Sequence, residues 1–206
     1  MNDIPEIRYA RNGDVALAYQ VLGEGPIDLV FLPGFITNLE IAWENPLYAR
    51  FLRRLASFSR LILMDRRGTG LSDRMAPEDL PPLEVLMDDL AVVLDAVGSE
   101  RTALFGFSDS GCLCAMFAAT HPDRVTALAL FAVAAVGVAA EDFPWQWTKD
   151  EWDDYFRELQ AGWGTRAYAD RMVPWFTPSH ADDERYKAWY ARFMRQAASP
   201  NSVEAI

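Results

Sequence analysis

Ser108 stands where the sequence changes from an apolar run to a helical stretch, and its neighbours are of the kind that expose a hydroxyl group. The segment 106–111 reads G-F-S-D-S-G and follows the apolar run 102–105. A strand-to-helix turn holds a serine clear of the backbone when small residues stand two positions before and two after it. Gly106 and Ser110 are small, although Ser110 replaces the second glycine of the pattern G-x-S-x-G. The segment predicts a nucleophilic serine, and the alternative is an ordinary turn in which Ser108 caps the helix.

A serine nucleophile needs a base to accept its proton, and the chain has 2 histidines. His121 lies where the helix after Ser108 should end, roughly 20 Å along that helix. We therefore expect His121 to interact with the C-terminus of the helix. His180 lies before the last helical stretch, where a helix lead-in and a catalytic role are the two alternatives. The sequence thus predicts a nucleophile without an identified acid or base.

The 2 cysteines carry no obvious chemistry. Cys112 and Cys114 are two positions apart on a predicted helix, so their side chains should point about 200° apart. They cannot easily form a disulfide or share a metal, and we expect both to be buried as small hydrophobic residues. Because no pair of histidines stands at ligand spacing either, the sequence implies no metal and no cofactor.

Buried strands and amphipathic helices must position Ser108, and they alternate along the first part of the chain. The expected strands are 7–10, 15–22, 27–32, 60–65, 102–105 and 125–131, the last one buried. The expected helices are 47–58, 83–97 and one from about 109 to 121. Apolar residues at three- and four-residue spacing predict one buried stripe on each of the first two helices. The stripes are Leu47, Phe51, Leu52, Leu55 and Phe58 on the first helix, and Leu86, Leu90, Val93, Leu94 and Val97 on the second. This alternation predicts an α/β fold with a doubly wound, mostly parallel sheet. The turn that follows the strand 60–65 contains Asp65, Arg66 and Asp73, which we interpret as structural.

The composition changes after Ala140, where the strand pattern ends and 6 of the 7 tryptophans follow. Helical patterns over 151–160 and 182–196 predict a helical cap, so we divide the chain into a core at 1–140 and a cap at 141–206. Trp145 and Trp175 are candidates to line a substrate pocket. The alternative for the tryptophans is packing of the cap against the core, because aromatic side chains supply a large contact area in either role.

Composition and charge exclude several classes of partner. A formal net charge of -11 argues against binding nucleic acid or an anionic membrane surface, which reward a basic face. The longest apolar run, 125–140, is shorter than the roughly 20 residues that span a bilayer, so we expect no membrane insertion. The first residues lack the basic and apolar segments of a signal peptide, which favours the cytoplasm.

Three ordered segments give the chain a resemblance to the α/β-hydrolase superfamily over nearly its whole length. They are L-P-G-F at 32–35, D-R-R-G-T-G-L-S at 65–72 and the segment 106–111 around Ser108. The stretches 9–23 and 51–60 are most similar to a bacterial branch whose hydrolase domain is sometimes fused to a class III nucleotide cyclase.

The resemblance implies an oxyanion hole made by the backbone amides of Phe35 and Asp109, with Gly34 beside the substrate. The alternative for Phe35 is an ordinary core aromatic after a Pro-Gly turn. Relatives often have histidine before the loop glycine, where this chain has Pro33. The superfamily also places the acid and the histidine after two strands that follow the cap, and we expect those C-terminal strands to be missing here.

The sequence and the resemblance together predict a serine hydrolase that acts on a carboxylic ester or related acyl bond of a small apolar substrate. The acid and the histidine base are expected outside this chain. Haloperoxidase-like and lactonase chemistry use the same kind of turn. The alternatives are a non-catalytic sensor of a small ligand that regulates an attached domain such as a nucleotide cyclase, and a structural scaffold. Strand 125–131 should form an open edge that pairs with a completing C-terminal segment or a second molecule in a homo-oligomer.

Overall fold

A computed structural model describes residues 4–76, 79 and 81–203. The strands form one sheet in the order β1-β2-β4-β3-β5-β6. Their bounds are β1 Arg8–Asn12, β2 Val15–Leu22, β3 Asp28–Leu32, β4 Arg60–Met64, β5 Thr102–Phe107 and β6 Val125–Phe131. The pairs β1–β2 and β2–β4 are antiparallel, and the other three pairs are parallel. The mostly parallel α/β sheet expected from the sequence is therefore confirmed.

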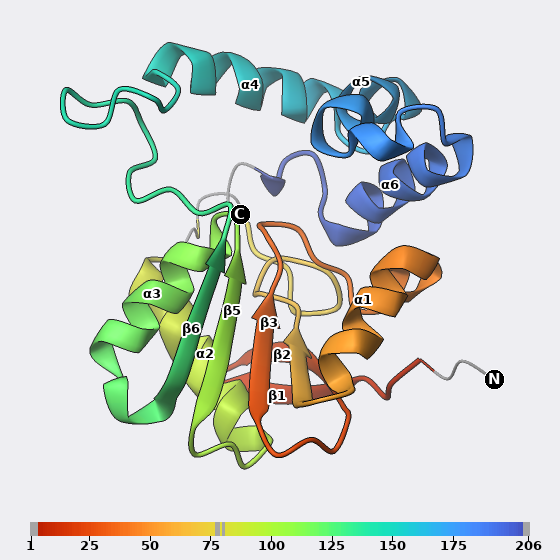
Figure 1. The fold of residues 1–206 in the computed structure, drawn as a ribbon. Helices are drawn as coiled ribbons and strands as arrows, with labels where there is room; N and C mark the ends of the chain where they lie inside the picture. Colours follow the sequence, from red (N-terminus) through yellow and green to blue (C-terminus); the bar gives the residue numbers. More distant parts are fainter. Residues whose placement is uncertain (1–3, 77–78, 80, 204–206) are drawn as a thin grey trace.

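Helices cover both faces of the sheet and one end of its strands (Figure 1). The α-helices are α1 Pro46–Ala56, α2 Leu83–Ala96, α3 Ser110–Thr120, α4 Lys149–Gly162, α5 Arg166–Phe176 and α6 Glu184–Ala197. Short 3-10 turns are η1 Ile41–Glu44, η3 Pro122–Arg124 and η4 Pro178–His180. Figure 1 shows α2 and α3 behind the sheet, α1 in front of it, and α4, α5 and α6 above the carboxyl ends of the parallel strands. These last three are called the cap helices below.

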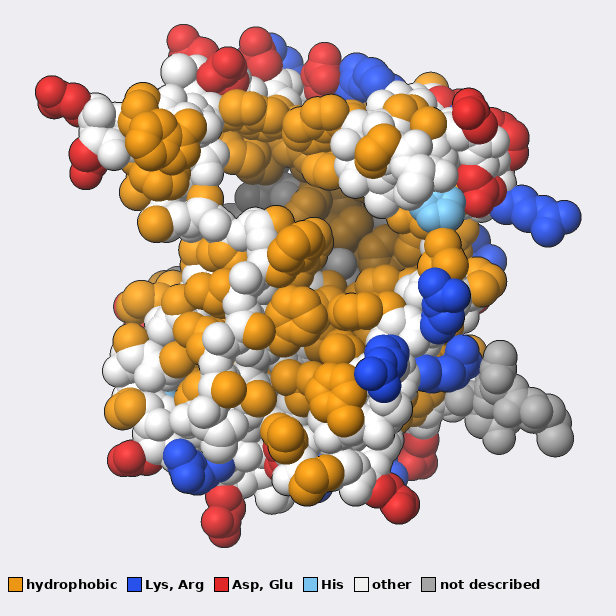
Figure 2. All heavy atoms as spheres, viewed as in Figure 1, with side chains coloured by type: hydrophobic (Ala, Val, Ile, Leu, Met, Phe, Trp, Pro, Cys, Tyr) orange, Lys and Arg blue, Asp and Glu red, His pale blue; other side chains and the backbone are white. Residues whose placement is uncertain are grey.

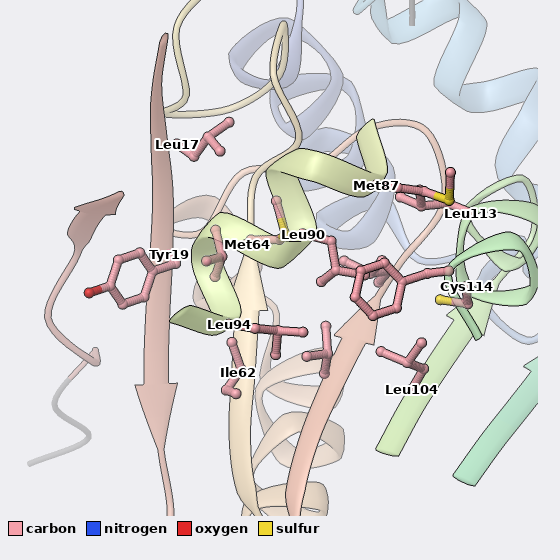
Figure 3. Packing of buried hydrophobic residues seen from close by; sticks show 14 of the residues in the cluster. Leu17, Tyr19, Ile62, Met64, Met87, Leu90, Leu94, Leu104, Leu113 and Cys114 are labelled. Carbon is pink, nitrogen blue, oxygen red and sulfur yellow. The ribbon is translucent and has the colours of Figure 1, made fainter. Parts of the chain in front are cut away.

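The rear face of the sheet carries the larger core, which the sequence pattern anticipated. Leu90, Val93 and Leu94 of α2 are fully buried against the sheet, and Phe117 of α3 joins them. Figure 3 shows Leu90 and Leu94 of α2 lying among side chains of the strands, such as Ile62 of β4 and Leu104 of β5. Burial of each such side chain contributes roughly 1.5–3 kcal/mol to folding. This packing fixes the place where β5 ends and α3 begins.

The front face is covered by α1 over only part of its width. Leu52 and Leu55 of α1 are buried as expected. Leu47, Phe51 and Phe58, which the periodicity also assigned to the buried stripe, are about 40% exposed or more. The prediction for these three is wrong, since α1 packs on β4 and η1 and Figure 1 shows no second helix on the front face of the sheet. The ring of Phe51 makes edge contacts there with Phe31 and Phe105.

The prediction that strand 125–131 is buried is also wrong. Within the described residues β6 is the last strand of the sheet, and every one of its residues after Val125 is exposed. Leu130 is 45% and Phe131 63% exposed. Figure 2 shows a broad hydrophobic surface on this side of the molecule, over the front of the sheet. The open edge that the sequence predicted for this strand is thus present.

The cap helices form a smaller apolar cluster of their own. Its buried residues are Leu159, Trp163, Tyr168, Met172, Met194, Ala198 and Val203. Helix α5 was not predicted, since Pro174 lies inside it and interrupts the helical pattern. Thr165 begins this helix by accepting a hydrogen bond from the amide of Tyr168. Among the residues that the structure describes, no helix has the length and apolarity to span a bilayer.

Candidate active site

Ser108 occupies the sharp turn between β5 and α3. Its φ of 57° lies in the left-handed region, which a residue with a side chain enters only at a cost. The turn is tight because a Cβ on Gly106 would lie 2.6 Å from the Cα of Gly111. The amide of Ser108 also donates a hydrogen bond to the carbonyl of Phe131 at the end of β6, over 3.0 Å. The turn therefore has the strained geometry that the sequence pattern predicted.

The loop after β3 passes directly against this turn. A Cβ on Gly34 would lie 3.5 Å from the Cβ and 3.9 Å from the Oγ of Ser108. The loop is tied down by Ser110, whose hydroxyl donates to the carbonyl of Pro33 over 2.9 Å. This bond explains what a serine does in place of the second glycine of the pattern: it connects the loop to the helix that carries Ser108.

Asp109 is placed beside Ser108 by the first turn of α3. It stands at the N-cap position, but its side chain makes no capping hydrogen bond. Its Oδ2 instead accepts a hydrogen bond from Nη1 of Arg66 over 2.8 Å. Arg66 was interpreted as structural from the sequence, which missed this contact. The contact follows from the sheet topology. Strands β4 and β5 both pair in parallel with β3, so residues just past their carboxyl ends lie at the same edge of the sheet.

Phe35 connects the same loop to the cap helices. Its backbone follows Gly34, and its ring packs against the cap cluster, with its centroid 6.3 Å from that of Trp163. Gly34 thus lies against Ser108 and Asp109 at the carboxyl ends of β3 and β5, with Phe35 next to it in the chain.

The two tryptophans proposed for a substrate pocket lie in two separate groups of aromatic rings in the cap region. Trp145 is 75% exposed and contacts Phe143. Trp175 is 57% exposed and stacks on Trp147 with their centroids 5.8 Å apart. Figure 2 shows a hollow between the cap helices and the core, with hydrophobic side chains around it. The contacts of both tryptophans are with other aromatic rings, so their role in binding substrate stays a prediction.

Both histidines make contacts of their own. His121 follows the last residue of α3, where its ring stacks on Phe117 with centroids 4.5 Å apart. His180 stacks on Tyr186 at 4.4 Å, and its Nδ1 lies 3.3 Å from a carboxylate oxygen of Asp183. The hydrogen bond to His180 contributes to holding the pKa of Asp183 below its ordinary value, after the larger effect of the Tyr186 amide. His121 thus lies at the opposite end of α3 from Ser108, as the sequence predicted.

The cysteines correct one expectation. Cys114 is buried, and burial raises the pKa of its thiol to about 12, so it is not a thiolate at neutral pH. Cys112 is exposed, because the helix face that carries it turns away from the sheet toward Ala134. Both are free thiols. The described parts of the chain contain no group of three or more His, Cys, Asp or Glu that could hold a metal ion.

Comparisons with known proteins agree with this geometry. The model of the family described as "alpha/beta hydrolase fold" matches residues 29–204. A pimeloyl-[acyl-carrier protein] methyl ester esterase of Pectobacterium atrosepticum is 31% identical over 129 residues, which are 63% of this chain and 46% of that protein. The mouse serine hydrolase BPHL is 26% identical over 84% of this chain and 59% of its own length. The chain thus spans about half the length of these curated relatives.

Solved structures show the same fold. An esterase from Exiguobacterium antarcticum superposes with a TM-score of 0.75 at 22% identity, over 96% of this chain and 70% of that one. The enol-lactonase from Burkholderia xenovorans LB400 superposes with a TM-score of 0.70 at 23% identity, over 96% and 71%. The narrower resemblance to hydrolase domains fused to nucleotide cyclases is not seen in these relatives. From its sheet, its strained serine turn and the family match, the chain belongs to the α/β-hydrolase fold family.

Proposed function

We propose that this chain carries the nucleophile and oxyanion hole of a serine hydrolase acting on a carboxylic ester or related acyl bond. The observation that carries the proposal is Ser108 in a left-handed conformation at the β5–α3 turn, with the Gly34 loop against its side chain. A strained serine beside a glycine loop is the arrangement in which a hydroxyl and two backbone amides can meet one carbonyl group. The hydrolases and esterases among the relatives support the same reaction class.

The reaction proceeds in two steps. Ser108 Oγ attacks the carbonyl carbon of the substrate while a base accepts the hydroxyl proton, and the amides of Phe35 and Asp109 donate to the resulting oxyanion. The tetrahedral intermediate collapses, the base returns the proton to the departing alcohol, and an acyl-serine remains. Water then repeats these steps and releases the acid. A small apolar acyl group is the substrate class proposed, because hydrophobic side chains surround the hollow beneath the cap helices (Figure 2).

The base and its acid are proposed to come from outside these 206 residues. Stacking and hydrogen bonding engage His121 at the far end of α3 and His180 against Tyr186. The open edge of β6 lies beside the serine turn, since the Phe131 carbonyl accepts from the amide of Ser108. A completing polypeptide segment, or a second copy of the chain, that pairs with β6 would bring its own side chains to this site.

Labelling with a fluorophosphonate tests the nucleophile directly. At concentrations where a second copy can supply the base, intact mass should show one adduct on the wild-type chain and on Ser57→Ala, a matched control at the exposed end of α1, and none on Ser108→Ala. Labelling that persists in Ser108→Ala would overturn the assignment. A folded wild-type chain that is never labelled, but whose melting temperature rises with an apolar acyl ligand, would favour the ligand-sensor alternative.

A further inference from the structure

Arg66 is a buried cation at the end of β4, one residue past Asp65. The residue is 7% exposed, and its Nη1 lies 2.8 Å from Asp109 Oδ2 and 3.4 Å from Ser110 Oγ. A guanidinium is removed from water at a high cost unless well-placed acceptors compensate. Here the acceptors include the two residues that immediately follow the proposed nucleophile.

The same contacts continue to the loop after β3. The hydroxyl of Ser110 accepts from Arg66 and donates to the carbonyl of Pro33. The other carboxylate oxygen of Asp109, Oδ1, lies 3.3 Å from the position that a Cβ on Gly34 would take. Arg66 therefore links the ends of three strands: its own strand β4, the β5–α3 turn and the loop after β3.

We propose that Arg66 is a positioning residue for the oxyanion hole, a role that rests on the proposed function. By holding the carboxylate of Asp109 and the hydroxyl of Ser110, it fixes the spacing between the serine turn and the loop that carries Phe35. The two amides that must meet one oxyanion belong to these two segments. The Nη1 of Arg66 carries two protons, so this one nitrogen can donate to both acceptors in directions that the planar guanidinium fixes, whereas the ammonium of lysine rotates freely.

The same strand offers a matched control at its other end. Arg60 begins β4 and donates to both carboxylate oxygens of Asp28, over 2.7 and 2.5 Å. This pair holds the pKa of Asp28 below its ordinary value, chiefly through the Arg60 hydrogen bond. Replacing Arg60 removes a partly buried ion pair from the same strand without touching the serine turn.

Native-state hydrogen exchange tests the positioning role without requiring activity. In Arg66→Met the amides of 34–37 and 108–111 should exchange roughly 10-fold faster or more, because a charge-assisted hydrogen bond no longer opposes their local opening. Arg60→Met should leave those amides within about twofold of wild type. In Arg66→Lys and Asp109→Asn the exchange rates of these amides should lie between those of wild type and Arg66→Met. These two variants replace Arg66→Met in the test if that variant does not fold. Unchanged exchange at both segments, or the same pattern in the Arg66 and Arg60 variants, would overturn the proposal.

The rate at which fluorophosphonate labels Ser108 tests whether the position of these two segments affects the reactivity of the serine. The labelling rate of Ser108 should fall roughly 10-fold or more in Arg66→Met. Loss of one oxyanion donor lowers a reaction rate by about 100- to 1000-fold, and a misplaced donor should lower it by less. Arg60→Met should label at the wild-type rate. If the label attaches to a residue other than Ser108, the serine hydrolase proposal fails, whereas the exchange result still decides whether Arg66 holds the two segments together.

Discussion

Asp65 precedes Arg66 and holds two loops near the site through its carboxylate. It is fully buried, and its Oδ2 accepts hydrogen bonds from the amides of Leu39 and Leu71 over 3.2 and 2.8 Å. A Cβ on Gly70 would lie 2.1 Å from the same oxygen, and the φ of Gly70 is +55°, so this turn requires glycine. The sequence interpretation of Asp65 as structural agrees with these contacts.

The titration of Asp65 should make stability depend on pH. Burial raises its pKa to about 6, from an ordinary value near 3.9. The folded state then retains a proton that the unfolded state releases, so this group's contribution to the free energy of unfolding is lost as the pH rises from about 4 to 6. Asp65→Asn removes the titration. The free energy of unfolding of the variant should therefore rise relative to wild type, by roughly 3 kcal/mol across that interval.

Urea unfolding at several pH values between 4 and 7 measures this difference. Asp123→Asn, which changes an exposed aspartate in η3, is the matched control. A difference between Asp65→Asn and wild type that stays constant with pH would show that Asp65 does not titrate in this range.

Sequence reasoning located the sharp turn at Ser108, because the features of such a turn are local. Ser108, Gly106 and Ser110 could be identified because the turn between a strand and a helix imposes its requirements within a few positions. The bond between Arg66 and Asp109 joins residues 43 positions apart. No local pattern encodes it, because it depends on which strands become neighbours in the sheet.

At the scale of elements, β6 shows what apolar composition does and does not predict. The run Val125–Phe131 pairs in parallel with β5, and the ring of Phe131 stacks on Phe107 with centroids 5.7 Å apart. Membership of the sheet was therefore predictable from its β-branched and apolar residues. Burial was not, since it depends on a neighbouring element that the described residues do not supply.

The open edge of β6 should cause concentration-dependent association. Ala129 is exposed on the front face, in register with Phe105 of β5. Sedimentation velocity of the wild-type chain should show a rising average mass as the concentration increases, because an unpaired apolar edge strand is a template for another strand. Ala129→Lys should shift this association to higher concentration, since a charge on an edge strand opposes pairing.

Ala96→Lys is the control for added charge, because Ala96 lies at the exposed end of α2, behind the sheet. A wild-type chain that remains monomeric at every concentration tested would remove the edge of β6 as an interface between copies.

At the scale of the whole molecule, the cap helices are joined to the core through the end of α6. The carbonyls of Gln196 and Ala197 accept hydrogen bonds from the guanidinium of Arg74, and the Ala197 carbonyl also accepts from the amide of Gly70. A second attachment joins α6 to η1, where the indole of Trp189 donates a hydrogen bond to the carbonyl of Ile41. The helical pattern predicted α6 and α4, but these attachments lie between segments more than 100 residues apart and were beyond any local signal.

Arg74 should therefore control how readily the cap helices open. In Arg74→Ala, chymotrypsin should cleave within residues 141–203 roughly 5-fold faster, because cleavage follows the population of the opened form and the variant loses charge-assisted bonds to α6. Arg50→Ala, at an exposed position of α1, should be cleaved at the wild-type rate. Equal rates for the two variants would mean that other contacts hold the cap.

Phe35 has one further consequence, because its ring packs on the cap cluster while its backbone directly follows Gly34, which lies against Ser108. Any movement of the cap helices away from the core must either break the packing of Phe35 on Trp163 or pull on the loop after β3. The position of the cap helices that admits a substrate is then not the position that holds the loop after β3 in place. An open entrance would disturb the amide proposed as an oxyanion donor, and closure over a bound molecule would restore its position, so the proposed reaction would stop in the state that exposes Ser108 to water.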